Sequence, residues 1–365
     1  MTALLPEGLR DRLPPQADAA AAMLRAALDA IRAHGYERVA PPLAEYEESL
    51  VGRLKAGTAR DLLRVVDPLS QRTLALRPDI TTQVGRIAAT RLAARPRPLR
   101  LSYGGPVVKL RASQLRPERE MTQIGAELIG RDSAEAAAEI VALAVEALQA
   151  AGARGITVDL TMPDLVDTLA AGPFELEPAR ASQVRALLDA KDAGGLAAIG
   201  AEAYLPLIAA AGPFSEAVQR LRSFEPSLAP RLDAFEQIAR RLDGTAMVTL
   251  DPAERHGFEY QSWLGFSLFA EGLPGEVGRG GSYTILHEDG LEEPAVGFSI
   301  YPDPLLDLIE AEGGARRVFL PLGHDPAAAA RLRREGWITV AALDEQCRAD
   351  GCSHVLQGGS AAPLT

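Results

Sequence analysis

The placement of extended segments constrains the fold of this chain more than any other feature. Segments with strand-like composition or alternation fall before residue 162 and after residue 245, at residues 36–40, 72–77, 100–103, 106–110, 121–130, 157–161, 246–250, 263–269, 281–285 and 295–300. Residues 163–243 between them have helical spacing with Pro, Gly and Ala breaks and no convincing strand. Strands interspersed with helices, rather than a regular βαβ series, predict an α+β fold with a helical insertion.

Helical patterns and a change near the C-terminus define the expected domains. Spacing and capping residues predict helices over residues 16–34, 81–94, 134–151 and 304–311. The last part of the chain alternates strands and helices, at residues 318–321, 326–335, 338–343, 344–350 and 354–356. We therefore expect a core over residues 1–310, with its insertion at 163–243, and a small α/β appendage over residues 311–365.

The composition argues against several classes of protein. A formal net charge of −11 is a poor footprint for a nucleic-acid binder, which neutralises phosphates with Lys and Arg. No apolar run is long enough to span a membrane, and the first residues do not resemble a signal peptide. Cys347 and Cys352 are typical of reduced thiols rather than of a disulfide or metal framework. We expect a cytoplasmic protein without nucleic acid, membrane, metal or cofactor.

Three polar residues lie where core packing does not explain them. Asp79 follows the predicted strand at 72–77, and Gln123 and Glu127 are four residues apart on the strand at 121–130. Residues i and i+4 share one face of a strand. If that face is buried, the two side chains need partners, and together they suit an ammonium group or an imidazole. A simply solvated face is the alternative.

No familiar catalytic motif accompanies these residues. The sequence lacks GxxxxGK[ST], HExxH and GxSxG, and the glycines of residues 275–281 do not follow the GxGxxG register, which favours a glycine turn before a strand. His256, Tyr260 and Gln261 form a second polar and aromatic group. A lone histidine is more often an ordinary hydrogen-bonded or surface residue, so this group is informative only together with the first.

Taken in order, short motifs resemble those of class II aminoacyl-tRNA synthetases, and of histidyl-tRNA synthetase in particular. They cover residues 4–310 in the order of the family: GYERVAPP at 35–42 (motif 1), LRPDIT at 76–81, YGGP at 103–106 with REMTQIGAE at 119–127 (motif 2), ERHGFEYQS at 254–262 (the histidine loop), GSY at 281–283 and VGFSI at 296–300 (motif 3). Each motif alone is weak, but the ordered set is specific. The resemblance implies a class II antiparallel sheet flanked by helices, and a homodimer through motif 1.

The departures from that family concern the cations that hold ATP. Arginine suits this task because its planar fork grips phosphate and stays charged. The family's arginines of motif 2, the histidine loop, the GGRYD turn and motif 3 fall on Lys109, His256, Ser282 and Pro304. Arg255 and Arg111 are the neighbouring cations. The resemblance therefore implies weak or absent adenylation, and residues 310–365 are too few for the family's anticodon-binding domain.

This combination is similar to the synthetase paralogues that are regulatory subunits of ATP phosphoribosyltransferase. That enzyme condenses ATP with phosphoribosyl pyrophosphate in the first step of histidine biosynthesis. The resemblance implies a subunit with no catalytic residues, which a separate short-form catalytic subunit requires for activity. It also implies a hetero-oligomer, expected to be an octamer, with L-histidine as the feedback effector.

The amino-acid pocket of the family carries over residue by residue. Asp79, Thr81 and Gln123 are expected to hold the α-amino and carboxylate groups, and Glu127 to accept a hydrogen bond from the imidazole. The implied histidine site is completed by Lys109, His256, Tyr260 and Gln261. His256 and Gln261 depart from the family pattern, which leaves the pose of histidine open.

Three alternatives remain open. A divergent histidyl-tRNA synthetase would charge tRNA. A synthetase-like enzyme that forms amides, or modifies a protein or tRNA, would need the missing arginines. A scaffold would activate its partner without binding histidine, and a histidine titration distinguishes it from a sensor.

Overall fold

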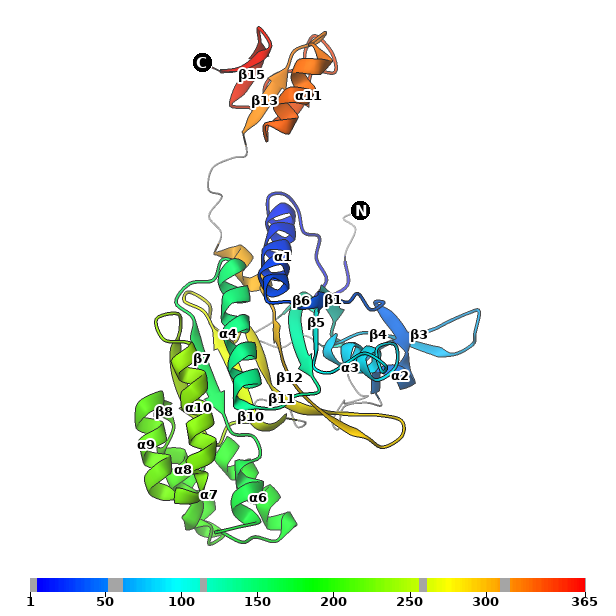
Figure 1. The fold of residues 1–365 in the computed structure, drawn as a ribbon. Coiled ribbons are helices and arrows are strands. Elements are labelled where there is room, and N and C mark those ends of the chain that lie inside the picture. Colours follow the sequence, from blue (N-terminus) through cyan, green and yellow to red (C-terminus); the bar gives the residue numbers. More distant parts are fainter. Residues whose placement is uncertain (1–4, 52–61, 112–116, 256–260, 309–315, 365) are drawn as a thin grey trace. The chain divides into compact units, whose positions relative to one another are not determined.

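The structure is a computed structural model that describes residues 5–51, 62–111, 117–255, 261–308 and 316–364. It divides into two compact units, residues 1–308 and residues 309–365. The larger unit is built on a nine-stranded sheet with helices against it (Figure 1). The smaller unit has its own four-stranded sheet and its own core.

The large sheet is mostly antiparallel. Its strands follow the order β1 (Glu37–Arg38), β5 (Leu99–Val108), β6 (Glu120–Ile129), β12 (Glu292–Ile300), β11 (Gly278–Leu286), β10 (Gln261–Phe269), β7 (Thr157–Thr161), β9 (Met247–Asp251) and β8 (Gly212–Pro213). Two neighbouring pairs, β1 with β5 and β7 with β9, are parallel, and the others are antiparallel. The α+β prediction is confirmed.

One face of this sheet is apolar and packs against helices. Ile124, Ala126 and Leu128 of β6 belong to one buried cluster with residues of α1 (Gln16–Ala33) and α4 (Ala134–Ala150). Ser133 begins α4 as expected, since its hydroxyl accepts a hydrogen bond from the N–H of Ala136. Because side chains alternate along a strand, Gln123 and Glu127 point to the opposite face of β6. The polar residues of interest therefore lie on the side away from α1 and α4.

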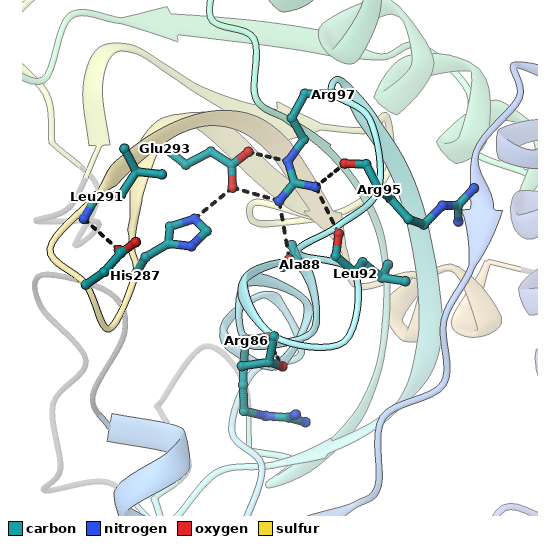
Figure 2. A network of polar contacts seen from close by, with 10 residues as sticks. Arg86, Ala88, Leu92, Arg95, Arg97, His287, Leu291 and Glu293 are labelled. Atoms are coloured by element: carbon teal, nitrogen blue, oxygen red, sulfur yellow. Dashed lines mark hydrogen bonds and ion pairs between the residues drawn. The ribbon is translucent and has the colours of Figure 1, made fainter.

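The opposite face is partly covered by α3 (Thr81–Ala89), which follows Asp79 in the chain. Next to α3 lie α2 (Glu47–Val51) and a small sheet of β2 (Ala44–Tyr46), β4 (Thr73–Leu76) and β3 (Leu63–Val66). Arg97 donates to the carbonyls of Ala88 and Leu92, at 3.3 and 3.0 Å, and pairs with Glu293 of β12 (Figure 2). Arg97 thus satisfies carbonyls at the C-terminal end of α3.

Glu293 also links the two sides of the β11–β12 hairpin next to its turn. Its second oxygen lies 2.9 Å from His287 Nε2 (Figure 2). The hairpin and α3 are therefore joined by charged groups at the end of α3 that lies away from Thr81.

The insertion is helical, with one small exception. It contains α5 (Leu165–Ala170), α6 (Pro178–Asp189), α7 (Ala193–Ala198), η2 (Glu202–Tyr204), α8 (Leu205–Ala209), α9 (Phe214–Phe224), η3 (Pro226–Leu228) and α10 (Ala229–Arg241). The expectation that this stretch has no strand is wrong, because β8 pairs with β9 at the sheet edge. With only two residues, β8 carries too little alternation to be found from sequence.

Glycines explain another difference from the prediction. We expected two strands around Gly104 and Gly105, but β5 runs through both. A Cβ on Gly104 would lie 2.7 Å from a methyl of Leu24, and one on Gly105 would lie 2.6 Å from the guanidinium of Arg77. These glycines allow close packing within a continuous strand rather than a turn.

The second unit orders its strands as β14 (Ile338–Ala341), β13 (Arg317–Leu320), β15 (His354–Gln357) and β16 (Ser360–Pro363), with α11 (Pro326–Arg334) beside them. The expected helix at 344–350 is wrong. Asp344 accepts a hydrogen bond from the N–H of Gln346, and Cys347 Sγ accepts one from Leu343, so local side-chain bonds replace the helical ladder. The expected helix at 304–311 is a 3-10 helix, η4 (Asp303–Asp307), and residues 309–311 lie outside the described residues.

Candidate functional site

The polar face of the sheet is organised around the hydroxyl of Tyr103, a fully buried residue. This hydroxyl lies 2.9 Å from Glu127 Oε1, 2.9 Å from Thr81 Oγ1 and 3.0 Å from Ser299 Oγ. Tyr283 donates to the other oxygen of Glu127 at 2.8 Å. Glu127 is only 1 % exposed, so a tyrosine hydroxyl takes the place of water as the hydrogen-bond donor to each of its oxygens.

A second set of bonds joins Gln123 to the start of α3. The side-chain oxygen of Gln123 accepts from the N–H of Ile80 at 2.9 Å. Its amide nitrogen donates to Asp79 Oδ2 at 2.8 Å and to Ser299 Oγ at 2.7 Å. Asp79 Oδ1, in contrast, is buried without a hydrogen-bond partner among the described residues. Donors of Thr81 and Thr82 near this carboxyl lower its pKa and so compensate part of its charge, and an ammonium group placed at Oδ1 would compensate more of it.

Three glycines in one lateral row form a floor beside Glu127. Glu127 pairs with Gly297, Gly297 with Gly281 and Gly281 with Gly265. The row carries no side chain until Thr161, which pairs with Gly265. A Cβ on Gly297 would lie 1.6 Å from Glu127 Oε2, so the carboxyl group leans over the floor. Bare strand backbone of this kind lets another group approach closely.

Gln261, the first residue of β10, covers the rest of this floor. Its amide nitrogen donates to the carbonyl of Gly280 at 2.8 Å. A Cβ on Gly265 would lie 2.4 Å from its side-chain oxygen, and one on Gly281 would lie 2.9 Å from its side-chain nitrogen. The remaining cavity of about 20 Å³ is bounded by Thr81, Glu127, Gln261, Arg279, Gly280, Gly281, Tyr283, Gly297, Phe298 and Ser299. That volume suits a water molecule, so a larger ligand requires side chains at the cavity wall to move, and Gln261 is the one that lies over the floor.

Burial changes the ionisation of both carboxyl groups. Removal from water raises the pKa of Glu127 to about 8, against the opposing effect of the Tyr283 and Tyr103 hydroxyls. Burial also raises the pKa of Asp79, and the hydrogen bond from Gln123 opposes it. At neutral pH Glu127 is therefore mostly protonated. A cationic ligand beside these groups would favour their ionised forms.

The structure joins five of the eight predicted site residues through these bonds and this cavity: Asp79, Thr81, Gln123, Glu127 and Gln261. The alternative of a solvated face is wrong, because Gln123 and Glu127 are 0 % and 1 % exposed. His256 and Tyr260 lie outside the described residues. Lys109 follows β5, and its Nζ lies 5.8 Å from the centre of the Tyr301 ring rather than at the cavity wall.

Four residues of this site were not predicted: Tyr103, Ser299, Tyr283 and Arg279. Each reaches its partners across strands, which a local pattern does not show. One signal was available in the glycines of the facing strands. Tyr103 pairs with Gly125, and a Cβ there would lie 2.4 Å from the tyrosine hydroxyl.

At two of the positions where the synthetases have arginine, this chain has a residue without a positive charge. Ser282 is fully buried, and its hydroxyl lies 2.8 Å from that of Ser262. Pro304 lies in η4, next to Asp303, whose carboxylate pairs with Arg12 at 2.9 Å. Neither position can offer a donor fork to a phosphate.

Comparisons with known proteins agree with this arrangement. The model of the histidyl-tRNA synthetase family matches residues 8–305. The ATP phosphoribosyltransferase regulatory subunit of Rhodospirillum centenum is 44% identical over 98% of this chain and 95% of that protein. The regulatory subunit of Gluconobacter oxydans is 38% identical over 99% and 97%. This chain belongs to the ATP phosphoribosyltransferase regulatory subunit family.

Solved structures place this regulatory subunit family in the class II synthetase fold. A protein from Bacillus halodurans, titled an ATP phosphoribosyltransferase regulatory subunit/histidyl-tRNA synthetase, has a TM-score of 0.81 at 23% identity over 97% of both chains. The histidyl-tRNA synthetase of Nostoc has a TM-score of 0.79 at 16% identity over 97% of this chain and 91% of that one. The predicted class II architecture is confirmed.

The described residues contain no group of three or more His, Cys, Asp or Glu side chains placed to hold a metal ion. Within the same ranges, no helix of this regulatory subunit family member has the length and apolarity to cross a membrane.

Proposed function

We propose that this chain is a non-catalytic subunit of ATP phosphoribosyltransferase that senses L-histidine. In this proposal it assembles with a separate short-form catalytic subunit, which needs it for activity, in a hetero-octamer. Homodimers form through the motif 1 region at residues 35–42. The observation that carries the proposal is the buried network of Asp79, Gln123 and Glu127 beside a glycine floor, in a family whose members are named regulatory subunits.

The network suits the chemistry of histidine. A flat imidazole can lie on the floor of Gly297 and Gly281, with a ring nitrogen directed to Glu127. The α-amino group can donate to Asp79, whose Oδ1 has no other partner among the described residues. Asp79 then faces a cation and Glu127 faces a ring N–H donor, and both contacts offset the cost of ionising these groups in a buried place.

The absence of catalysis is supported by the residues at the nucleotide-binding positions. A synthetase must stabilise the charge that develops on the α-phosphate, and arginines do this best. Here Ser282 is buried against Ser262, and Pro304 has neither a cation nor an N–H donor. We therefore expect no histidine-dependent exchange of pyrophosphate into ATP by the purified chain.

Feedback requires that histidine distinguish two states of the assembly. A ligand shifts an equilibrium only as far as its affinities for the two states differ. The side chain of Gln261 offers one such difference, because it covers the floor in this structure and must leave when a ligand enters. Ser299 and Tyr103 connect the floor to the start of α3.

One observation favours the scaffold as a second candidate. The cavity of about 20 Å³ does not hold an amino acid without movement of Gln261. A chain that only activates its partner has no need of that movement.

The deciding experiment combines assembly and titration. The full-length chain is mixed with the short-form catalytic subunit from the same genome, and complex formation is measured by pull-down and size-exclusion chromatography. Histidine is then titrated calorimetrically into the mixture, and phosphoribosyl transfer is followed in parallel. Saturable binding with inhibition supports the sensor. Activation without binding supports the scaffold, and the absence of a complex contradicts both.

A further inference from the structure

A second row of residues lies beside the glycine floor and has no role in the imidazole and ammonium contacts proposed above. Tyr103 pairs with Gly125, Gly125 with Ser299, and Ser299 with Arg279. Residues directly opposed across strands share a face, as do residues two apart along a strand. This row is therefore on the same face as Glu127 and its floor. The strand register itself places Arg279 at the site, and Arg279 bounds the cavity.

Arg279 is held at the cavity wall by an ordered partner. Its Nε donates to Glu276 Oε1 at 2.5 Å. The other oxygen of Glu276 accepts from Ser267 Oγ at 2.9 Å, and Ser267 is fully buried. The side chains of Arg279 and Glu276 are 29 % and 12 % exposed. The guanidinium is planar, so a bond through Nε orients the whole group.

The charges around the cavity are uneven. Asp79 and Glu127 supply carboxyl oxygens, which suit ammonium and imidazole but repel a carboxylate. Arg279 is the single Lys or Arg among the described residues that bound the cavity. An α-amino acid is a zwitterion, and without Arg279 its carboxylate would find only neutral donors such as Thr81 and Gln261 at the cavity wall, beside acidic groups that repel it. Arginine forms charge-assisted bonds to such a group.

We propose that Arg279 binds the α-carboxylate of the amino-acid effector and makes the site selective for an intact α-amino acid. This inference rests on the proposed histidine-sensing function. It divides the ligand into three parts: the imidazole goes to Glu127, the ammonium to Asp79 and the carboxylate to Arg279.

The test compares ligands that differ only in the carboxylate. Histidine, histidinol and histamine are titrated into the mixture of full-length chain and catalytic subunit. We expect the wild type to bind histidine about 10- to 100-fold more tightly than histidinol, the range of a charge-assisted interaction. In Arg279→Gln, the affinity for histidine should fall by the same factor, and the ratio of the histidine affinity to the histidinol affinity should fall to about 1. Arg279→Lys keeps the charge without the fork and should give an intermediate preference.

Arg220→Gln is the matched control. Arg220 also pairs with a nearby glutamate, Glu216 at 2.9 Å, but lies in the insertion and does not bound the cavity. Its histidine-to-histidinol preference should equal that of the wild type. Circular dichroism establishes that each variant is folded. If Arg279→Gln does not fold, Arg279→Lys decides, since a preference reduced by about threefold or more supports the assignment.

The outcomes separate this inference from the proposed function. A wild-type preference that survives in folded Arg279→Gln, or in Arg279→Lys where Gln does not fold, overturns the role of Arg279. A wild type that binds histidine and histidinol equally also overturns it, and leaves histidine sensing intact. A wild type that binds none of the three ligands contradicts the proposed function itself, and the inference with it.

Discussion

Two groups of positions in the same fold differ sharply in what they retain. The amino-acid group, Asp79, Gln123 and Glu127, is buried and tied together through Tyr103 and Ser299. The nucleotide group carries a buried serine at 282, a proline at 304 and a lysine at 109 where a synthetase has arginines. At these positions the described residues keep hydrogen-bonding groups that suit a small zwitterion, whereas Ser282 and Pro304 offer no guanidinium fork to a triphosphate.

The physical cost of the two groups explains why the contrast is informative. A buried polar network loses hydration and stabilises the fold only if each group finds a partner. The amino-acid group meets that condition except at Asp79 Oδ1. Serine and proline at the nucleotide positions carry no such cost. An ammonium group at Asp79 Oδ1 would complete this network, and this is how the contrast supports the proposed amino-acid site.

Removing Glu127 should have the largest effect. In Glu127→Ala, the hydroxyls of Tyr103 and Tyr283 lose their shared acceptor and the imidazole loses its partner. We expect histidine affinity to fall about 100-fold or more, and the free energy of unfolding to fall by about 1–3 kcal/mol. Calorimetric titration and urea unfolding measure the two effects. Glu216→Ala on the insertion is the control, and an unchanged affinity in Glu127→Ala would remove the proposed pocket.

The substitution Gly297→Ala adds a methyl group to the glycine floor, and we expect it to weaken histidine binding by displacing the carboxyl group of Glu127. The Cβ of Gly297→Ala would overlap Glu127 Oε2, so the carboxyl group must move or the strands must separate. We expect about 10- to 100-fold weaker histidine binding and about 1–3 kcal/mol lower stability. Gly275→Ala has nothing within 4 Å of its added Cβ and should leave both quantities unchanged. Equal behaviour of the two variants would show that the floor is not part of the site.

The regular strands were more predictable from sequence than the site. The sequence predicted β6 and β7 within a residue or so of their ends, because short and mostly apolar runs bounded by turn residues are typical of buried strands. The prediction failed where glycines serve packing, as in β5, and where side chains compete with the backbone, as at Asp344. The first effect depends on partners that the fold brings near, whereas the second depends on bonds between close neighbours in sequence that compete with the helical ladder.

The site was predictable only in part for the same reason. Gln123 and Glu127 were identified because their spacing places them on one face of a strand. Tyr103, Ser299 and Arg279 were not, because they join the site through the register of β5, β12 and β11. Sequence spacing shows which residues share an element. It does not show which strands become neighbours.

The raised pKa of Glu127 gives a prediction for the free protein. Its pKa is about 8 when folded, against a reference value of 4.5. The folded state therefore holds a proton that the unfolded chain has lost, and stability present below pH 4.5 is lost as the pH rises toward 8. We expect the unfolding free energy to fall by about 3 kcal/mol between pH 5 and 8.

The variant Glu127→Gln separates this carboxyl from its neighbour. It cannot ionise, so its stability should depend less on pH over that range, measured by urea unfolding at fixed ionic strength. Asp79 has a pKa raised in the same direction, so some dependence should remain. The burial argument would be contradicted if the free energy of unfolding of the wild type increased from pH 5 to 8 and that increase were absent in Glu127→Gln.

The smallest effect is expected at Lys109, and it sharpens the contrast between the two groups. Lys109 is four residues beyond Gly105, the partner of Gln123, about 14 Å along the sheet at strand spacing, and its Nζ lies 5.8 Å from the centre of the Tyr301 ring. Lys109 therefore lies beyond the Gln123 end of the site and does not bound the cavity. Lys109→Ala should therefore change histidine affinity less than about threefold. A large loss for histidine but not for histidinol would instead assign the carboxylate to Lys109, and would join the two groups of positions into a single ligand site.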